Sequence, residues 1–61
     1  MSHITLQPHS LTNPSDKYRV VRFDDWRAFA DGELHHLPCV AEFTESAVAD
    51  AHRDELNDAD S

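Results

Sequence analysis

The chain has 61 residues, a formal net charge of −7 and a single cysteine, Cys39. A chain of this length forms one small domain whose core supplies at most about 3–5 kcal/mol, and no intramolecular disulfide can add to that. Its acidity argues against binding to nucleic acid or to an anionic membrane, both of which require basic surfaces. The lone thiol, and the polar residues that follow Met1 where a leader would be basic and then apolar, predict a cytoplasmic protein without a membrane segment.

The charge is unevenly distributed along the chain. Residues 1–23 contain three basic residues against one acid, a net of +2, whereas residues 24–61 contain two basic residues against eleven acids, a net of −9. Apolar and aromatic residues are too frequent for a disordered acidic tail. A protein partner with a basic groove is therefore the natural electrostatic match.

The first part of the chain predicts a weak edge strand followed by the clearest strand of the molecule. Residues 1–16 are expected to be loosely ordered or to form an edge strand, because residues 3–7 alternate in polarity until Pro8 interrupts them. A β-meander is predicted over residues 17–43. It begins with a strand over residues 17–23, which are rich in aromatic and β-branched side chains.

The middle of the meander has two interpretations. Residues 26–32 fit a strand, and they also fit a short helix in which Trp26, Phe29 and Ala30 share one face. Because Asp31-Gly32 is typical of a hairpin turn, we favour the strand. A third strand is expected over residues 33–43, as an edge strand or with a bulge at Pro38.

Residues 44–58 predict an amphipathic helix, and residues 59–61 a disordered tail. Thr44 suits the N-cap and Val48 the hydrophobic staple, and Val48, Ala51 and Leu56 are expected to anchor the helix to the sheet. The predicted fold class is α+β. It comprises a three-stranded antiparallel sheet, or a four-stranded one if the N-terminal segment joins it, with one C-terminal helix packed on one face.

The predicted helix carries a row of acids. Asp50, Asp54 and Asp58 recur at i, i+4 and i+8, about 6 Å apart along the axis at the usual rise per residue. Like charges at this spacing destabilise a helix, and acids near its C-terminus oppose the dipole. The row is either a solvated surface that aids solubility or a surface kept for a partner.

Catalytic and metal-binding constellations are weak. Cys39 with His35 or His36 could form a thiol–imidazole pair, but no glycine-rich loop follows to complete an acyl-transfer site. These residues and His52 are acceptable zinc ligands, yet their spacing matches no recurrent zinc motif. We therefore predict no catalytic residue, no metal site and no cofactor.

The remaining chemistry lies in the acids, which we predict to bind a protein partner by imitating the phosphates of DNA. Carboxylates accept bidentate arginine contacts as phosphates do, and an acidic row can enter a groove lined with basic residues. The predicted partner-binding residues are Asp50, Asp54, Asp58, Glu55, Asp24, Asp25, Asp31 and Glu33.

The strand at residues 18–23, the segment at residues 26–32, a third strand and the stretch FTESAVADAHRDELND at residues 43–58 together resemble small phage-encoded anti-CRISPR proteins. Those directed at type I complexes, type I-C among them, are the most similar in style. The resemblance implies a monomeric inhibitor in the host bacterial cytoplasm that binds a Cas effector subunit and not nucleic acid. An antitoxin-like inhibitor of another basic nucleic-acid enzyme and a non-enzymatic assembly adaptor remain alternatives.

Overall fold

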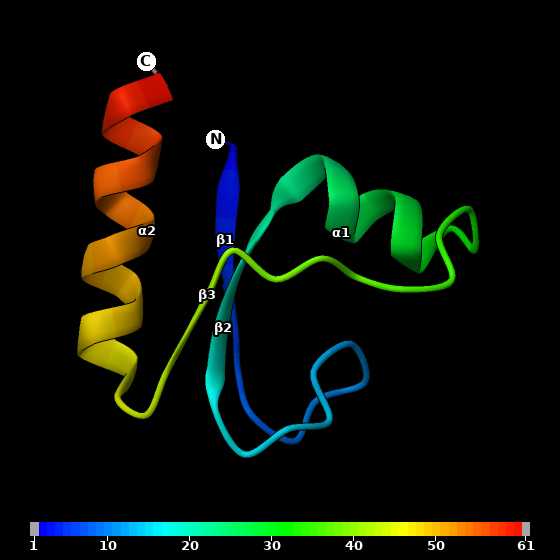
Figure 1. Cartoon of the computed structure of the whole chain (residues 1–61), viewed down its shortest axis with the longest axis horizontal. Helices are drawn as coiled ribbons and strands as arrows, with labels where there is room; N and C mark the ends of the chain where they lie inside the picture. The colour runs from blue at the N-terminus through cyan, green and yellow to red at the C-terminus, as the bar shows by residue number, and fades with distance from the viewer. Residues whose placement is uncertain (1, 61) are drawn as a thin grey trace.

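A computed structural model describes residues 2–60, and the side chains of residues 2–59. Its elements are strand β1 (His3–Leu6), strand β2 (Tyr18–Arg22), helix α1 (Phe23–Ala30), strand β3 (Ala41–Phe43) and helix α2 (Ser46–Asp60). The strands form one antiparallel sheet in the order β1-β2-β3 (Figure 1). The predicted α+β class, with a three-stranded antiparallel sheet and a C-terminal helix on one face, is confirmed.

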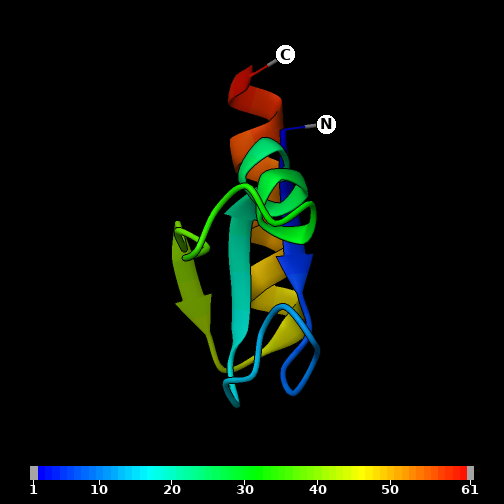
Figure 2. The ribbon, with the colours of Figure 1, turned by 90° about the vertical axis from the view of Figure 1, so that its right-hand side faces the viewer.

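The two helices lie on opposite sides of the sheet. Figure 2 looks at the molecule from the side of α1, with the sheet behind it and α2 farthest from the viewer. The molecule measures 28 × 28 × 12 Å along its principal axes. Its short dimension is close to the width of three strands about 4.8 Å apart, so the sheet is a narrow ribbon between two helices.

The core is built on two consecutive valines of β2. Val20 and Val21 both have an exposed fraction of 0%. Successive side chains of a strand point to opposite faces, so each valine serves a different layer. Tyr18 pairs with Phe43, and the ring of Phe43 lies 5.3 Å from that of His52 on α2. Val20 therefore faces α2, because it shares a face with Tyr18, and Val21 faces the α1 side.

The predicted middle strand is wrong, because residues 23–30 form helix α1. Gly32 has a φ of 83°, and its N–H donates to the Phe29 carbonyl at 3.1 Å. The Glu33 N–H donates to the Ala28 carbonyl at 2.8 Å. This is the Schellman arrangement that ends many helices. The Asp31-Gly32 pair thus serves as a helix C-terminus and not as a hairpin turn.

The predicted third strand is much shorter than expected. Only Ala41–Phe43 pairs with β2 as a strand, while residues 33–39 cross the molecule outside the sheet and the Val40 N–H donates to the Val20 carbonyl at 2.9 Å. Pro38 lacks a donor, and the adjacent His35 and His36 are both exposed. The sheet also contains β1 on the other side of β2, which agrees with the predicted N-terminal edge strand.

Helix α2 begins two residues later than predicted and ends later as well. The Ala49 N–H donates to the Glu45 carbonyl at 3.1 Å, which makes Glu45, and not Thr44, the N-cap residue. Val48 is 46% exposed, so it does not act as the predicted staple. The helix continues through Asp60, within the predicted disordered tail, and Ser61 lies outside the described residues.

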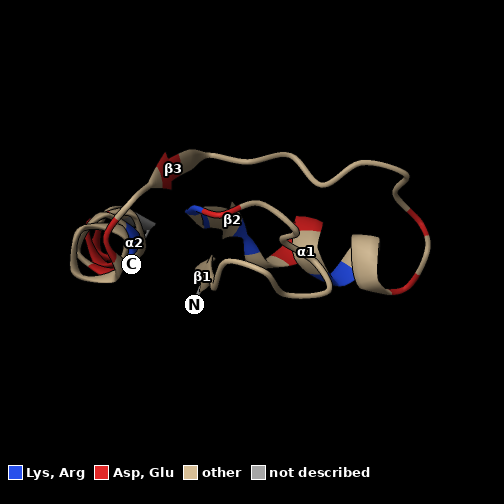
Figure 3. Ribbon diagram, turned by 90° about the horizontal axis from the view of Figure 1, so that it is seen from below, with Lys and Arg blue, Asp and Glu red and all other residues tan. Residues whose placement is uncertain are grey.

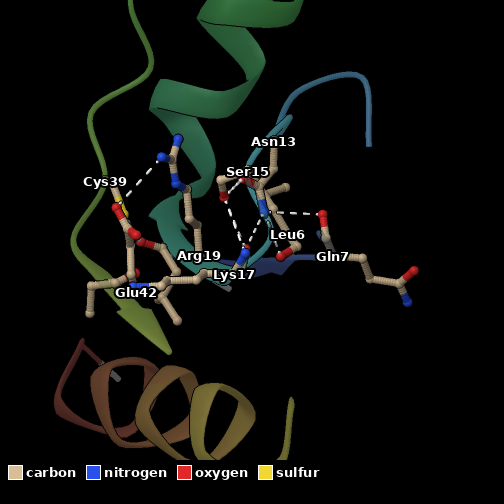
Figure 4. Close-up of polar contacts among 10 residues, drawn as sticks. Leu6, Gln7, Asn13, Ser15, Lys17, Arg19, Cys39 and Glu42 are labelled. Carbon is tan, nitrogen blue, oxygen red and sulfur yellow. Dashed lines mark hydrogen bonds and ion pairs between the residues drawn. The ribbon is translucent and has the colours of Figure 1, made fainter. Parts of the chain in front are cut away.

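The connection between β1 and β2 is organised by a buried amide. The Asn13 side chain has an exposed fraction of 0%, and its Nδ2 donates to the carbonyls of Leu6, Gln7 and Lys17 at 2.8–3.3 Å (Figure 4). Ser15 Oγ donates to Asn13 Oδ1 at 2.6 Å. Since a buried polar group requires partners, these bonds fix the loop around Asn13.

Candidate partner-binding surface

The face that α2 turns to the sheet differs from the predicted one. Ala49 is fully buried, and His52 and Leu56 are half-buried. Val48 and Ala51, two of the three predicted anchors, are exposed. The packed face is therefore rotated away from Val48 and centred on Ala49, His52 and Leu56.

The four predicted acids of α2 lie on its flank and outer side. Asp54, Glu55 and Asp58 are exposed, and Asp50 is half-buried. Figure 3, which views α2 end-on, shows acidic residues along this helix on the side of the molecule opposite to α1. Three of the four carboxylates are therefore presented to solvent together, on the outermost layer of the molecule.

Arg53 modifies this acidic surface in a way that the sequence prediction missed. Its guanidinium donates to Asp50 Oδ1 at 3.3 Å, and through Nε and a terminal nitrogen to Asp54 Oδ1 at 3.1 and 3.0 Å. Two members of the Asp row thus share one intramolecular cation. The signal was present in the sequence, because Asp50 and Arg53 have the i, i+3 spacing that allows side chains to meet on a helix.

The other four predicted acids lie in the α1 layer. Asp24 is exposed and Asp25 half-buried in the first turn of α1, while Asp31 and Glu33 are exposed at its far end. The sheet separates this layer from α2 (Figure 3). The structure therefore divides the eight predicted residues into two sets of four on opposite sides of the sheet.

Cys39 lies beside an ion pair that joins strands β2 and β3. Arg19 contacts Glu42 at 3.5 Å, and the Cys39 thiol donates to the Ala41 carbonyl at 3.1 Å (Figure 4). Partial burial of the thiol, reinforced by the Glu42 carboxylate and opposed by the Arg19 guanidinium, raises the pKa of Cys39 above its ordinary value. A raised pKa lowers the thiolate fraction at neutral pH, which works against a nucleophilic role.

Metal ligation finds little support in the side-chain arrangement. Across residues 2–59, no group of three or more His, Cys, Asp or Glu side chains is placed to hold a metal ion. His52, one of the candidate ligands, instead packs its ring against Phe43.

Neither described helix is both long and apolar enough to cross a membrane.

An exposed leucine is the second feature that the sequence prediction missed. Leu11 has an exposed fraction of 102% and lies at the tip of a two-residue turn closed by mutual Ser10 and Asn13 backbone bonds at 2.9 and 3.2 Å. Thr12 Oγ1 accepts a bond from Trp26 Nε1 at 3.3 Å, which ties the turn to α1. The tip is therefore held in place while its apolar side chain remains in water.

Comparison with known proteins adds no relative: no family model, no curated protein and no solved structure matches the chain.

Proposed function

We propose that this protein is a non-enzymatic inhibitor that occupies a basic DNA-reading groove of a bacterial CRISPR–Cas effector complex and thereby blocks target DNA binding. The observation that carries the proposal is the exposed acidic side of α2, where Asp54, Glu55 and Asp58 face solvent. The chain's net charge of −7 gives this surface a long-range attraction for basic grooves.

The spacing of the acids supports imitation of a nucleic-acid backbone. Residues four apart on a helix lie about 6 Å apart along its axis, whereas phosphates follow one another about every 3.4 Å along a DNA strand. Asp54 and Asp58 therefore match roughly every second phosphate. A groove that normally binds DNA would exchange phosphate contacts for carboxylate contacts of similar geometry.

The internal Arg53 contact supports the same chemistry. Two guanidinium nitrogens of Arg53 donate to the same oxygen of Asp54, at 3.0 and 3.1 Å. A guanidinium can therefore reach this carboxylate from the side of the helix. An arginine of a partner groove would make the same kind of charge-assisted bond, which is stronger than a neutral one.

The direct test is competition between the protein and duplex DNA for a purified type I effector complex. We expect the wild-type protein to displace DNA, and Asp54→Asn/Glu55→Gln/Asp58→Asn to lose most of this ability. The matched control is Asp24→Asn/Asp31→Asn/Glu33→Gln, which removes the same charge from the α1 layer and should still compete.

The outcomes separate the proposal from its alternatives. Failure of the wild-type protein to displace DNA at any concentration would exclude this target, and the test would then move to other basic nucleic-acid enzymes recovered from bacterial lysate. Equal loss in both triple variants would show that net charge acts, and not the surface of α2. Circular dichroism of each variant verifies that the fold is retained.

A second candidate function, a non-enzymatic assembly adaptor, is favoured by the apolar side chains that remain in water. Leu11 is fully exposed on a fixed turn, and Val48 is 46% exposed on α2. An adaptor would bind through such groups, so its affinity would change little with ionic strength, whereas electrostatic docking weakens steeply. Measuring binding from roughly 50 to 500 mM salt, over which the Debye length shortens about threefold, distinguishes the two.

A further inference from the structure

The outer edge of β1 is covered by a side chain and not by another strand. Asn57 Oδ1 accepts the His3 N–H at 2.8 Å, and Asn57 Nδ2 donates to the His3 carbonyl at 3.3 Å. Asn57 Oδ1 also accepts from the N and Oγ of Ser2, at 3.3 and 3.2 Å. A single amide of α2 therefore binds both backbone groups of His3 and holds the residue before it.

The direction of these backbone groups follows from the β1–β2 ladder. The Phe23 N–H donates to the Ser2 carbonyl at 2.7 Å, so the carbonyl of Ser2 points toward the β2 side. Backbone groups of an antiparallel strand alternate between the two sides of the strand. Those of His3 consequently point away from β2, and the same alternation directs those of Thr5 to the same outer edge.

An edge strand whose backbone groups point outward is a template for another strand. In an antiparallel pair, the partner residue contributes one donor and one acceptor to each outward-facing residue. The side-chain amide of asparagine also contributes one acceptor and a donor group. Asn57 thus occupies, at His3, the position that an added strand would take.

We propose that the outer edge of β1 is a pairing surface for a second copy of this chain, and that Asn57 keeps this surface closed. A second β1 related by a two-fold axis would approach antiparallel, with Thr5 opposite Thr5, which is the self-complementary geometry of symmetric dimers. The strand His3–Leu6 contains no acidic residue, so two copies can meet there without placing carboxylates directly opposite one another.

Sedimentation velocity over a range of protein concentrations tests the proposal. We expect the wild-type protein to remain a monomer and Asn57→Ala to form a dimer as its concentration rises. Asn57→Asp keeps the acceptor for the His3 N–H but removes the donor to its carbonyl, and it should dimerise less than Asn57→Ala. A folded Asn57→Ala protein that stays monomeric at every concentration would overturn the proposal.

A second substitution identifies the surface. Thr5→Pro removes an outward-facing donor and leaves the β1–β2 ladder bonds, because proline is accepted on edge strands where the N–H faces away from the sheet. Combined with Asn57→Ala, it should return the protein to a monomer. A dimer that persists in the double variant would place the contact elsewhere and overturn the assignment to β1.

Amide hydrogen exchange in the wild-type protein answers the same question if Asn57→Ala fails to fold. The His3 N–H, bound by Asn57, should exchange about tenfold more slowly than the Thr5 N–H, which points to the same edge and is not among the groups that Asn57 binds. Equal exchange at the two positions would mean that Asn57 does not protect the edge, and the proposal would fail.

Discussion

The two helices place aspartate at opposite ends of their dipoles. α1 carries Asp24 and Asp25 in its first turn, where the partial positive charge of the helix N-terminus favours anions. α2 has no acid in its first turn and carries Asp54 and Asp58 in its second half, where the dipole disfavours them. Helix stability thus explains Asp24 and Asp25 and leaves Asp54 and Asp58 unexplained, which is why α2 is the better candidate for binding a partner.

The largest expected loss of folding stability comes from substituting the two valines that lie between the helices. Val20→Ala should loosen the α2 layer and Val21→Ala the α1 layer, each at a cost of about 2–3 kcal/mol, because each deletes fully buried methyl groups. That is about half or more of the roughly 3–5 kcal/mol expected for a domain of this size. Urea unfolding measures the loss, and amide exchange shows which helix is affected.

Exchange that accelerates equally in α1 and α2 for both valine variants would contradict this division. It would mean that the two layers unfold as one unit despite packing on different residues.

The Schellman end of α1 is tested next. Gly32→Ala should lower the free energy of unfolding by about 1 kcal/mol, because a φ of 83° suits glycine and strains alanine. Beyond the glycine and its two chain neighbours, no atom lies within 4 Å of the added Cβ, so the cost is conformational and not steric. Glu33→Ala is the control, since it keeps the N–H that donates to Ala28. Equal stability of Gly32→Ala and wild type in urea would refute this explanation.

Charge removal tests the difference between the helices directly. Asp24→Asn/Asp25→Asn should destabilise the protein by about 1 kcal/mol, because two favourable dipole interactions are lost. Asp54→Asn/Glu55→Gln should change stability by less than about 0.5 kcal/mol, as usual for exposed side chains, while weakening competition with DNA. Thermal unfolding and the competition assay measure the two effects, and the reverse pattern would invalidate the assignment of function to α2.

A small effect on stability is also expected for Arg53→Gln. An ion pair at the protein surface contributes about 0–1 kcal/mol, so the fold should respond little. Its removal frees the carboxylates of Asp50 and Asp54, and binding to a basic groove should tighten by a few-fold, roughly 1 kcal/mol at most. Arg27→Gln on α1 is the control with the same change in charge. Weaker binding by Arg53→Gln would show instead that Arg53 orients Asp54 for the partner.

Local signals in the sequence predicted part of the fold correctly. β2 was found because aromatic and β-branched residues are concentrated there, and α2 because its apolar residues recur with helical spacing. α1 was missed because Asp31-Gly32 suits both a hairpin turn and a helix end. The helix end is distinguished from the hairpin turn only because residues 33–40 do not form a partner strand. Whether they do so depends on the whole sheet and not on the local sequence.

Local sequence patterns could not predict features that depend on packing between elements. The sequence favoured Val48 as an anchor of α2 because it is large and apolar, yet α2 packs on the sheet through Ala49. A narrow sheet lets a helix approach closely, and close approach favours the smaller side chain. The exposed carboxylates of α2 were predictable from spacing, whereas the separation of the eight acids by the sheet required the position of α1.

The narrowness of the sheet has an evolutionary consequence. In a ribbon of three strands only the middle one has a neighbour on each side, and Val20 and Val21 are the fully buried apolar side chains of β2. Most other positions contact water and accept many substitutions at little cost in stability. Selection on the fold alone would therefore preserve a short signature, two adjacent β-branched residues and a small residue on the facing helix, while the surface diverges rapidly to follow a changing partner.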